Sequence, residues 1–279
     1  MPDYIENVGD ARERLIEALQ AKRCLRHGAI EWISLVGILV LVTLASLWFT
    51  RPLACISGPR RPSQHTLFHN LKLTIGEGEK ATSTEMVLLA DNPCIRLIRN
   101  FLTGEEVAHL LANYKHLLAP SMVAENGVDA YSQDRTSSTG YLPAGGDKDD
   151  SILLDIEKKV VLLSGIPLEF WETFQMTHYV EGQQYKPHYD WFNDSENNRS
   201  ATIFIYLNTV SKEHGGATEF PRLNLSVQPQ LGSAIIWFNC AARGNSVQCD
   251  IATEHAGLPP NSGEKIGLNC WSRTLPFRT

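Results

Sequence analysis

Two histidines and an aspartate in the second half of the chain have the types and spacing of a metal site. His188 and Asp190 are two residues apart, and side chains at that spacing point to the same face of a β-strand, so both can reach one ion. His255 would supply a third ligand from far along the chain. Two neutral imidazoles and one carboxylate leave the other positions of an octahedron open, which is the arrangement associated with non-haem Fe(II) oxygenases. The chain has nine histidines, so the pattern needs support from the surrounding sequence.

The composition indicates one globular domain with an additional segment. The chain has 279 residues, of which 43% are hydrophobic and 20% are charged. A single domain of about 150–200 residues accounts for most of that length. The net charge is −6 and there is no long basic run, so no nucleic-acid partner is expected.

The stretch from Trp32 to Phe49 contains no charged residue and predicts a transmembrane helix over residues 32–50. A helix of this length spans about 27 Å, close to the hydrocarbon thickness of a thin bilayer. A cleaved signal peptide and a buried core helix are the alternatives, but the stretch starts later and is longer than the apolar part of a typical signal peptide. Residues 1–31 would then form a tail, and residues 51–90 a stalk or linker with several prolines.

Cysteines and glycosylation sequences favour a lumenal position for the rest of the chain. The residues concerned are Cys55, Cys94, Cys240, Cys249, Cys270, Asn193, Asn198 and Asn224. Because disulfides and N-glycans form in the secretory pathway, we expect a single-pass protein of the endoplasmic reticulum or Golgi membrane. Cys240 and Cys249 fit a disulfide that closes a hairpin, and two buried thiols are the alternative.

Two amphipathic helices are predicted at the start of a globular domain that begins near Asp91. The sequence TGEE from Thr103 has the form of a capping box, and apolar residues at helical spacing follow it. We therefore expect a helix over about residues 104–118. A second apolar stripe follows Asp150 and ends before Gly165, which predicts a second helix.

Short segments rich in β-branched and aromatic residues follow the helices and predict strands. They are residues 174–180, 201–207, 234–238 and 266–271, and Gly, Pro and Asn turns separate them. Strands after helices in this order fit an α+β fold, namely a double-stranded β-helix (jelly roll) with supporting helices on one face. This domain would occupy residues 91–279, and the mouth of its barrel is where a metal can bind.

An ordered series of short motifs runs through this domain. It consists of Arg135-Thr-Ser-Ser138, Gln175-x-x-x-Tyr179-x-x-Gly182-Gln-x-Tyr185-x-x-His188-Tyr-Asp190, Arg199-x-x-Thr202, Tyr206-Leu-Asn208, Gly215-Gly-x-Thr218-x-Phe220-Pro221, Pro229-x-x-Gly232, Phe238-Asn239, His255-Ala-Gly257, Gly263-x-Lys265 and Asn269-x-Trp271. This series resembles the prolyl 4-hydroxylase family. So many ordered matches are far more specific than a single His-x-Asp, and they do not extend to the segment before residue 91.

The resemblance implies a catalytic centre of four residues. His188, Asp190 and His255 would bind Fe(II). Lys265 would hold the distal carboxylate of 2-oxoglutarate, which needs a cation once the keto-acid end of that co-substrate binds the metal.

The resemblance also implies residues around this centre. Tyr179 and Thr218 would be hydroxyl partners of the co-substrate, and Trp271 would either line its pocket or belong to the core. Arg135 and Arg199 are implied on the substrate side, and a structural hydrogen-bonding role is the alternative for both. Ile266 departs from the family pattern, which commonly has tryptophan after the lysine.

The implied activity is the hydroxylation of prolyl residues in peptides or secreted proteins, with 2-oxoglutarate converted to succinate and CO2. It would use Fe(II), 2-oxoglutarate, O2 and L-ascorbate. The layout is similar to small single-span members of the family, so no obligate second subunit is implied. A dioxygenase acting on a free amino acid or small peptide, and an inactive membrane-anchored binding protein, are the alternatives.

Overall fold

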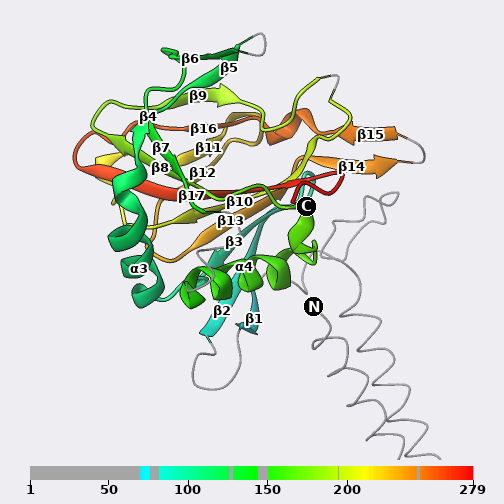
Figure 1. Ribbon diagram of the computed structural model, residues 1–279, viewed down its shortest axis with the longest axis horizontal. Helices are drawn as coiled ribbons and strands as arrows, with labels where there is room; N and C mark the ends of the chain where they lie inside the picture. The colour runs from blue at the N-terminus through cyan, green and yellow to red at the C-terminus, as the bar shows by residue number, and fades with distance from the viewer. Residues whose placement is uncertain are drawn as a thin grey trace, which may run out of the picture. The chain divides into compact units, whose positions relative to one another are not determined.

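The described strands form a large sheet, a small sheet and two separate strand pairs, one of them β5 (Val123–Glu125) with β6 (Val128–Ala130) (Figure 1). The computed structural model describes residues 70–75, 82–125, 128–143, 150–193, 195–243 and 246–278. In spatial order the large sheet contains β1 (Asn70–Ile75), β2 (Thr82–Ala90), β3 (Ile95–Arg99), β13 (Ala234–Phe238), β10 (Arg199–Tyr206), β17 (Glu264–Arg273), β8 (Gln175–Val180), β7 (Ser138–Tyr141) and β4 (Ala119–Pro120). The small sheet contains β12 (Leu225–Val227), β11 (Thr218–Phe220), β16 (His255–Gly257) and β9 (Tyr185–His188).

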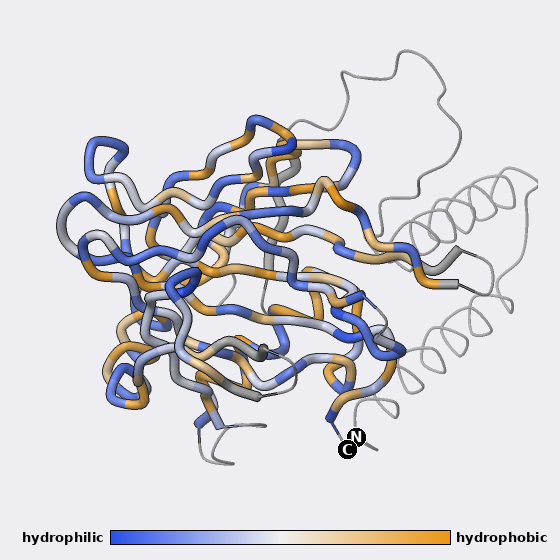
Figure 2. Tube along the Cα trace, turned by 90° about the horizontal axis from the view of Figure 1, so that it is seen from above, coloured by the Kyte–Doolittle hydropathy of each residue, from blue (hydrophilic) through white to orange (hydrophobic). Residues whose placement is uncertain are grey.

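Three layers build the domain. The small sheet covers one face of the large sheet, and the helices α3 (Gly104–Tyr114) and α4 (Ser151–Ser164) lie on the opposite side (Figure 1). One apolar core lies between the helices and the large sheet, and a second, which includes Phe220 and Trp237, lies between the two sheets. Hydrophobic segments accordingly follow the packed strands, whereas several outer turns are hydrophilic (Figure 2). The predicted jelly roll with helices on one face is confirmed.

The sequence of β10 is mostly apolar on both faces because the strand lies between the two cores. Ile203 and Ile205 pack in the core under the helices, whereas Phe204 and Tyr206 pack in the core between the sheets. Successive side chains of a strand point to opposite faces, so a central strand that is covered on both sides favours apolar residues on both faces. β10 pairs with β13 on one side and β17 on the other.

The two predicted helices are present. The capping box of α3 is complete, because the backbone N–H of Glu106 donates to Thr103 Oγ1 at 3.1 Å and the N–H of Thr103 donates to Glu106 Oε2 at 2.8 Å. The α-helix ends at Tyr114, earlier than predicted, and a short 3-10 helix (η3, Lys115–Leu117) follows. Asp150 caps α4, and Gly165 ends it with a φ of 70°.

The prediction of a linker over residues 51–90 is wrong at its C-terminal end. β1 pairs with β2, and β2 pairs with β3, so these strands extend the large sheet. Thr84 and Met86 are buried on one side of β2, whereas Ser83 is exposed. The alternation is hard to recognise in the sequence, because a threonine occupies one of the inward positions. The ordered sheet therefore begins before Asp91.

The predicted tail, transmembrane helix and first part of the linker lie outside the described residues. Within the part of the chain that the structure describes, no helix is long and apolar enough to cross a membrane. The predicted span over residues 32–50 therefore stays a prediction.

A disulfide joins Cys240 and Cys249. They are register partners on a separate hairpin, made by β14 (Cys240–Arg243) and β15 (Ser246–Cys249). Of the two alternatives that the sequence left open, the structure has the disulfide. Cys270, on β17, is a buried free thiol.

Candidate active site

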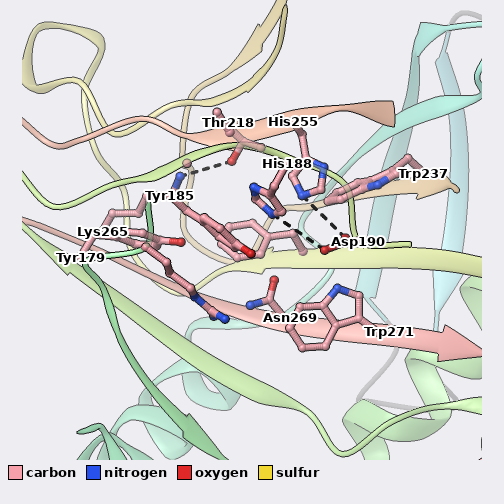
Figure 3. Close-up of a pocket in the computed structure, with 14 residues that line it drawn as sticks. Tyr179, Tyr185, His188, Asp190, Thr218, Trp237, His255, Lys265, Asn269 and Trp271 are labelled. Atoms are coloured by element: carbon pink, nitrogen blue, oxygen red, sulfur yellow. Dashed lines mark hydrogen bonds and ion pairs between the residues drawn. The ribbon is translucent and has the colours of Figure 1, made fainter. Parts of the chain in front are cut away.

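The small sheet brings the three predicted metal ligands together. His188 at the end of β9 and His255 at the start of β16 are register partners. Asp190 lies just beyond β9, so it does not share a strand with His188 as predicted, but it still faces the same point. One ligand atom from each residue lies within 4.8 Å of the other two. Figure 3 shows the three side chains converging on the wall of one cavity.

Hydrogen bonds orient both imidazoles toward Asp190. His188 Nδ1 is 2.8 Å from the carbonyl oxygen of Lys186, and His255 Nδ1 is 2.9 Å from that of Thr253. A carbonyl can only accept, so each Nδ1 carries the proton and each Nε2 offers its lone pair to the site. The Nε2 atoms lie 3.9 Å and 3.6 Å from the Asp190 carboxylate oxygens.

The electrostatics suit a divalent cation. Burial, with a contribution from His255, lowers the pKa of His188 to about 3, so this imidazole is neutral at physiological pH. Burial alone would raise the pKa of Asp190, but the two histidines and Arg199 outweigh it and the pKa is lowered. Two imidazoles and an ionised carboxylate, all largely buried, form the donor set that Fe(II) takes in non-haem sites.

Lys265 lies at the other end of the same cavity, with only 1% of its surface exposed. Its Nζ donates to the Thr218 hydroxyl and to the Ala217 carbonyl oxygen, both at 3.3 Å. Among the described residues no carboxylate forms an ion pair with it. Burial lowers the pKa of Lys265 to about 7. A buried amine that lacks a counter-ion matches the distal carboxylate of a dicarboxylic ligand.

The other predicted co-substrate residues surround Lys265. Tyr179 on β8 is its register partner, and Nζ lies 5.5 Å from the centroid of the Tyr179 ring. Tyr179, Thr218 and Trp271 all line the cavity. Trp271 therefore forms part of the wall rather than of the inner core.

The two predicted substrate-side arginines differ in position. Arg135 lines the cavity and donates from Nη2 to Gln175 Oε1 at 2.7 Å. Arg199 is absent from the lining. It donates to both carboxylate oxygens of Glu172, at 2.7 and 2.9 Å, and stacks 3.8 Å above the Trp271 ring. The geometry favours the structural alternative for Arg199.

Several residues that the sequence reading did not assign also belong to the site. Tyr185 stacks on His188 with 3.4 Å between ring centroids, and Asn269, Phe204 and Trp237 line the cavity. Thr202 donates a hydrogen bond to Asp190 Oδ2 at 2.6 Å. A threonine in the otherwise apolar run of β10 was the available signal, but its partner could not be read from the sequence.

Comparisons with known proteins agree with this geometry. Residues 174–273 match the model of the 2OG-Fe(II) oxygenase superfamily. The chain is 31% identical over 219 residues to a probable prolyl 4-hydroxylase 7 of Arabidopsis thaliana, covering 70% of this chain and 67% of that protein. It is also 31% identical over 235 residues to prolyl 4-hydroxylase 5 of the same plant, covering 73% and 75%. The chain belongs to the prolyl 4-hydroxylase family.

A solved structure supports the assignment of this chain to the prolyl 4-hydroxylase family. The viral collagen prolyl hydroxylase of Paramecium Bursaria Chlorella virus-1, in a 2OG complex, is similar with a TM-score of 0.53 and 28% identity. The match covers 65% of this chain and 96% of that one. The family resemblance seen in the motifs is confirmed, and the family together with the His-Asp-His group supports Fe(II) and 2-oxoglutarate as metal and co-substrate.

Proposed function

We propose that this chain hydroxylates prolyl residues in peptides or secreted proteins, with 2-oxoglutarate converted to succinate and CO2. One observation carries the proposal: a single cavity holds the His188, Asp190 and His255 group at one end and, at the other, Lys265, with which no described carboxylate forms an ion pair. The first group matches Fe(II), and the second matches the far carboxylate of the co-substrate. A binding protein without activity has no need of both.

The residues of the chain divide the work between them. His188, Asp190 and His255 would hold the metal, and Lys265 with the hydroxyl groups of Thr218 and Tyr179 would hold 2-oxoglutarate. When bound, iron and the co-substrate would together with O2 supply the oxidising power for C–H hydroxylation. Ascorbate would keep the iron in its reduced state. The protein contributes the positions of these groups in a largely buried cavity.

Two buried donors in the cavity wall suit acceptor groups of bound molecules. Arg135 Nε and Trp271 Nε1 are both buried, and no described residue accepts a hydrogen bond from them. Buried donors without partners are rare. We therefore infer that carbonyl or carboxylate oxygens of bound molecules accept hydrogen bonds from these two N–H groups when the cavity is filled. For Arg135, which packs 4.9 Å from the Tyr185 ring centroid, a peptide carbonyl of the substrate is the proposed partner.

The test is turnover by the full chain in detergent with Fe(II), 2-oxoglutarate, O2 and a panel of proline-containing peptides. We expect succinate to form together with a peptide heavier by one oxygen atom, and fragmentation should place that oxygen on the prolyl ring. Succinate formed only with free proline or another small amino acid would support the alternative substrate class. No succinate with any substrate would contradict the proposal.

We further propose that the chain is a single-pass membrane protein with its catalytic domain in the lumen of the endoplasmic reticulum or Golgi. The uncharged segment over residues 32–49 and the Cys240–Cys249 disulfide support this, because disulfides persist in oxidising compartments. Protease treatment of sealed microsomes should spare residues 51–279. Digestion of that region without detergent would contradict the proposal.

The structure narrows the sites at which this lumenal domain would carry glycans. Asn198 is buried, and its Nδ2 donates to the carbonyl oxygen of Phe192 at 2.6 Å, so a glycan there would disrupt the loop. Asn193 and Asn224 are exposed and remain the candidates. A glycosidase should increase the mobility of the protein on a gel, and Asn198→Gln should not alter that shift.

A further inference from the structure

A buried chain of three hydrogen bonds leads from the core between the sheets to Asp190. Trp237 Nε1 donates to Asn239 Oδ1 at 2.9 Å, and Asn239 Nδ2 donates to Thr202 Oγ1 at 2.9 Å. Thr202 Oγ1 then donates to Asp190 Oδ2 at 2.6 Å. All four side chains are at least nine-tenths buried, so water does not compete with these contacts.

Trp237, at the end of the series farthest from Asp190, determines which group donates in each of the three hydrogen bonds. An indole N–H can only donate, so Trp237 requires the oxygen of the Asn239 amide to face it. That choice turns the amide nitrogen toward Thr202, whose oxygen must accept. The single hydroxyl proton of Thr202 is then left for Asp190. Each donor in the series therefore serves one acceptor, and none has a second acceptor among the described residues.

The contact assigns different roles to the two Asp190 oxygens. Oδ2 accepts the Thr202 proton and lies 3.6 Å from His255 Nε2, whereas Oδ1 lies 3.9 Å from His188 Nε2. Rotation of the carboxylate would break a short hydrogen bond between two buried side chains, so the Thr202 hydroxyl keeps the carboxylate in the orientation that faces both histidines. Hydrogen bonds of this kind to metal ligands raise metal affinity by fixing ligand orientation.

Asn239 is also connected to a second ligand through its backbone. Its carbonyl oxygen accepts from the N–H of Asp250 at 2.8 Å, and Asp250 caps the 3-10 turn η7 (Ile251–Thr253). The carbonyl of Thr253, at the end of that turn, is the group that orients His255. One residue outside the cavity thus supports two of the three ligands.

We propose that Thr202 and Asn239 are positioning residues that set the orientation of Asp190 and so determine the metal affinity of the site. This deepens the proposed function, on whose metal site it rests. The alternative is that this series of hydrogen bonds only provides partners for buried polar groups in the core. A merely structural role would change the stability of the fold but not the affinity of the folded protein for metal.

The test compares variants of the full chain by anaerobic titration with Mn(II), followed by the electron paramagnetic resonance signal of free and bound ion. Thr202→Val keeps the shape but removes the donor, and we expect its affinity to fall about tenfold or more. Thr202→Ser keeps the hydroxyl and should restore most of the affinity. Asn239→Asp presents Thr202 with a second acceptor, so it should weaken binding and broaden the signal of bound Mn(II).

Thr84→Val is the matched control, because Thr84 is equally buried but donates to the carbonyl oxygen of Asn100, in the turn after β3 and away from the metal ligands. It should change thermal stability and leave Mn(II) affinity unaltered. If Thr202→Val does not fold, Thr202→Cys replaces the hydroxyl with a weak S–H donor in an unbranched side chain. Wild-type affinity in a folded Thr202→Val or Thr202→Cys variant would overturn the proposal. Since the titration needs neither peptide nor O2, it can succeed even if prolyl turnover fails.

Discussion

His188 and His255 are register partners on antiparallel strands, and their imidazole centroids lie 4.3 Å apart. The pairing of β9 with β16 is therefore what creates the ligand pair. Formation of the small sheet and formation of the metal site are one event, because neither histidine reaches the other without that register. Asp190 completes the group from the turn that follows β9.

We predict that His188→Ala, Asp190→Ala and His255→Ala each abolish iron-dependent turnover while the fold persists. The two hydrophobic cores contain none of these residues, so the strands should still pair. Bound iron measured after gel filtration should fall with activity, and the circular dichroism spectrum should resemble that of the wild type. Turnover at the wild-type rate in any of the three would show that the ligand is another residue.

Local patterns in the sequence were sufficient for the parts of the fold that depend on local physics. The capping box at Thr103 and the apolar stripe after Asp150 rest on contacts within one helix, so their spacing was informative. The pairing of Arg199 with Glu172 and the contact of Thr202 with Asp190 depend on strand order. Nothing in the separation of those residues along the chain indicates these contacts, so the sequence alone does not distinguish a substrate-side role for Arg199 from a structural one.

Acid should destabilise the protein through Asp150. This carboxylate accepts from the N–H groups of Ile152 and Leu153 and from the side chains of His109 and Tyr114. Burial opposes ionisation, but these hydrogen bonds outweigh it and lower the pKa of Asp150 to about 2.

Because the unfolded chain has the ordinary pKa near 3.8, the folded state gains stability above that pH and loses it as the pH falls toward 2. The gain is about 2 kcal/mol. Asp150→Asn keeps an N-cap but removes the charge. In urea unfolding, wild type should exceed this variant by about that amount at pH 6 and by much less near pH 2. A difference that does not vary with pH would contradict the assignment.

Arg278 near the C-terminus should be important for stability. Its guanidinium pairs with Glu157, whose side chain is 3% exposed, and donates to the carbonyl oxygens of Trp171 and Glu172. Arg278→Met leaves the Glu157 charge buried without a partner, at a cost of about 3–5 kcal/mol. Arg222→Met is the control, because its pair with Glu254 is on the surface, where solvent screens the attraction, and its loss should change stability far less. The double variant Arg278→Met with Glu157→Met should recover much of the lost free energy of unfolding, as measured by chemical denaturation.

Lys265→Ala separates co-substrate binding from metal binding. It removes the cation expected to face the distal carboxylate of 2-oxoglutarate and leaves that carboxylate unpaired, which costs about 2–5 kcal/mol. The KM for 2-oxoglutarate should rise roughly thirtyfold or more, while Mn(II) affinity stays at the wild-type value. Lys265→Arg keeps the charge in a longer, planar group and should rescue only in part. An unchanged KM in Lys265→Ala would mean that a different cation, such as Arg135, holds the co-substrate.

The same lysine should lower the stability of the free protein. Burial lowers the pKa of Lys265 from 10.5 to about 7, because the charged amine loses its hydration and no carboxylate in the described part of the chain pairs with it. Between these two pH values the unfolded chain binds more protons than the folded one, so the stability of the wild type rises with pH across that range.

Lys265→Met removes this penalty while it keeps the length and apolar stem of the side chain. It should be more stable than the wild type by on the order of 2–5 kcal/mol at pH 7 and below, and the difference should shrink as the pH approaches 10. Added 2-oxoglutarate with Mn(II) should stabilise the wild type much more than the variant, because the ligand provides the missing counter-ion. A Lys265→Met protein that is less stable than the wild type at pH 7 would contradict this prediction. It would mean that the buried amine of Lys265 does not lower the stability of the free protein.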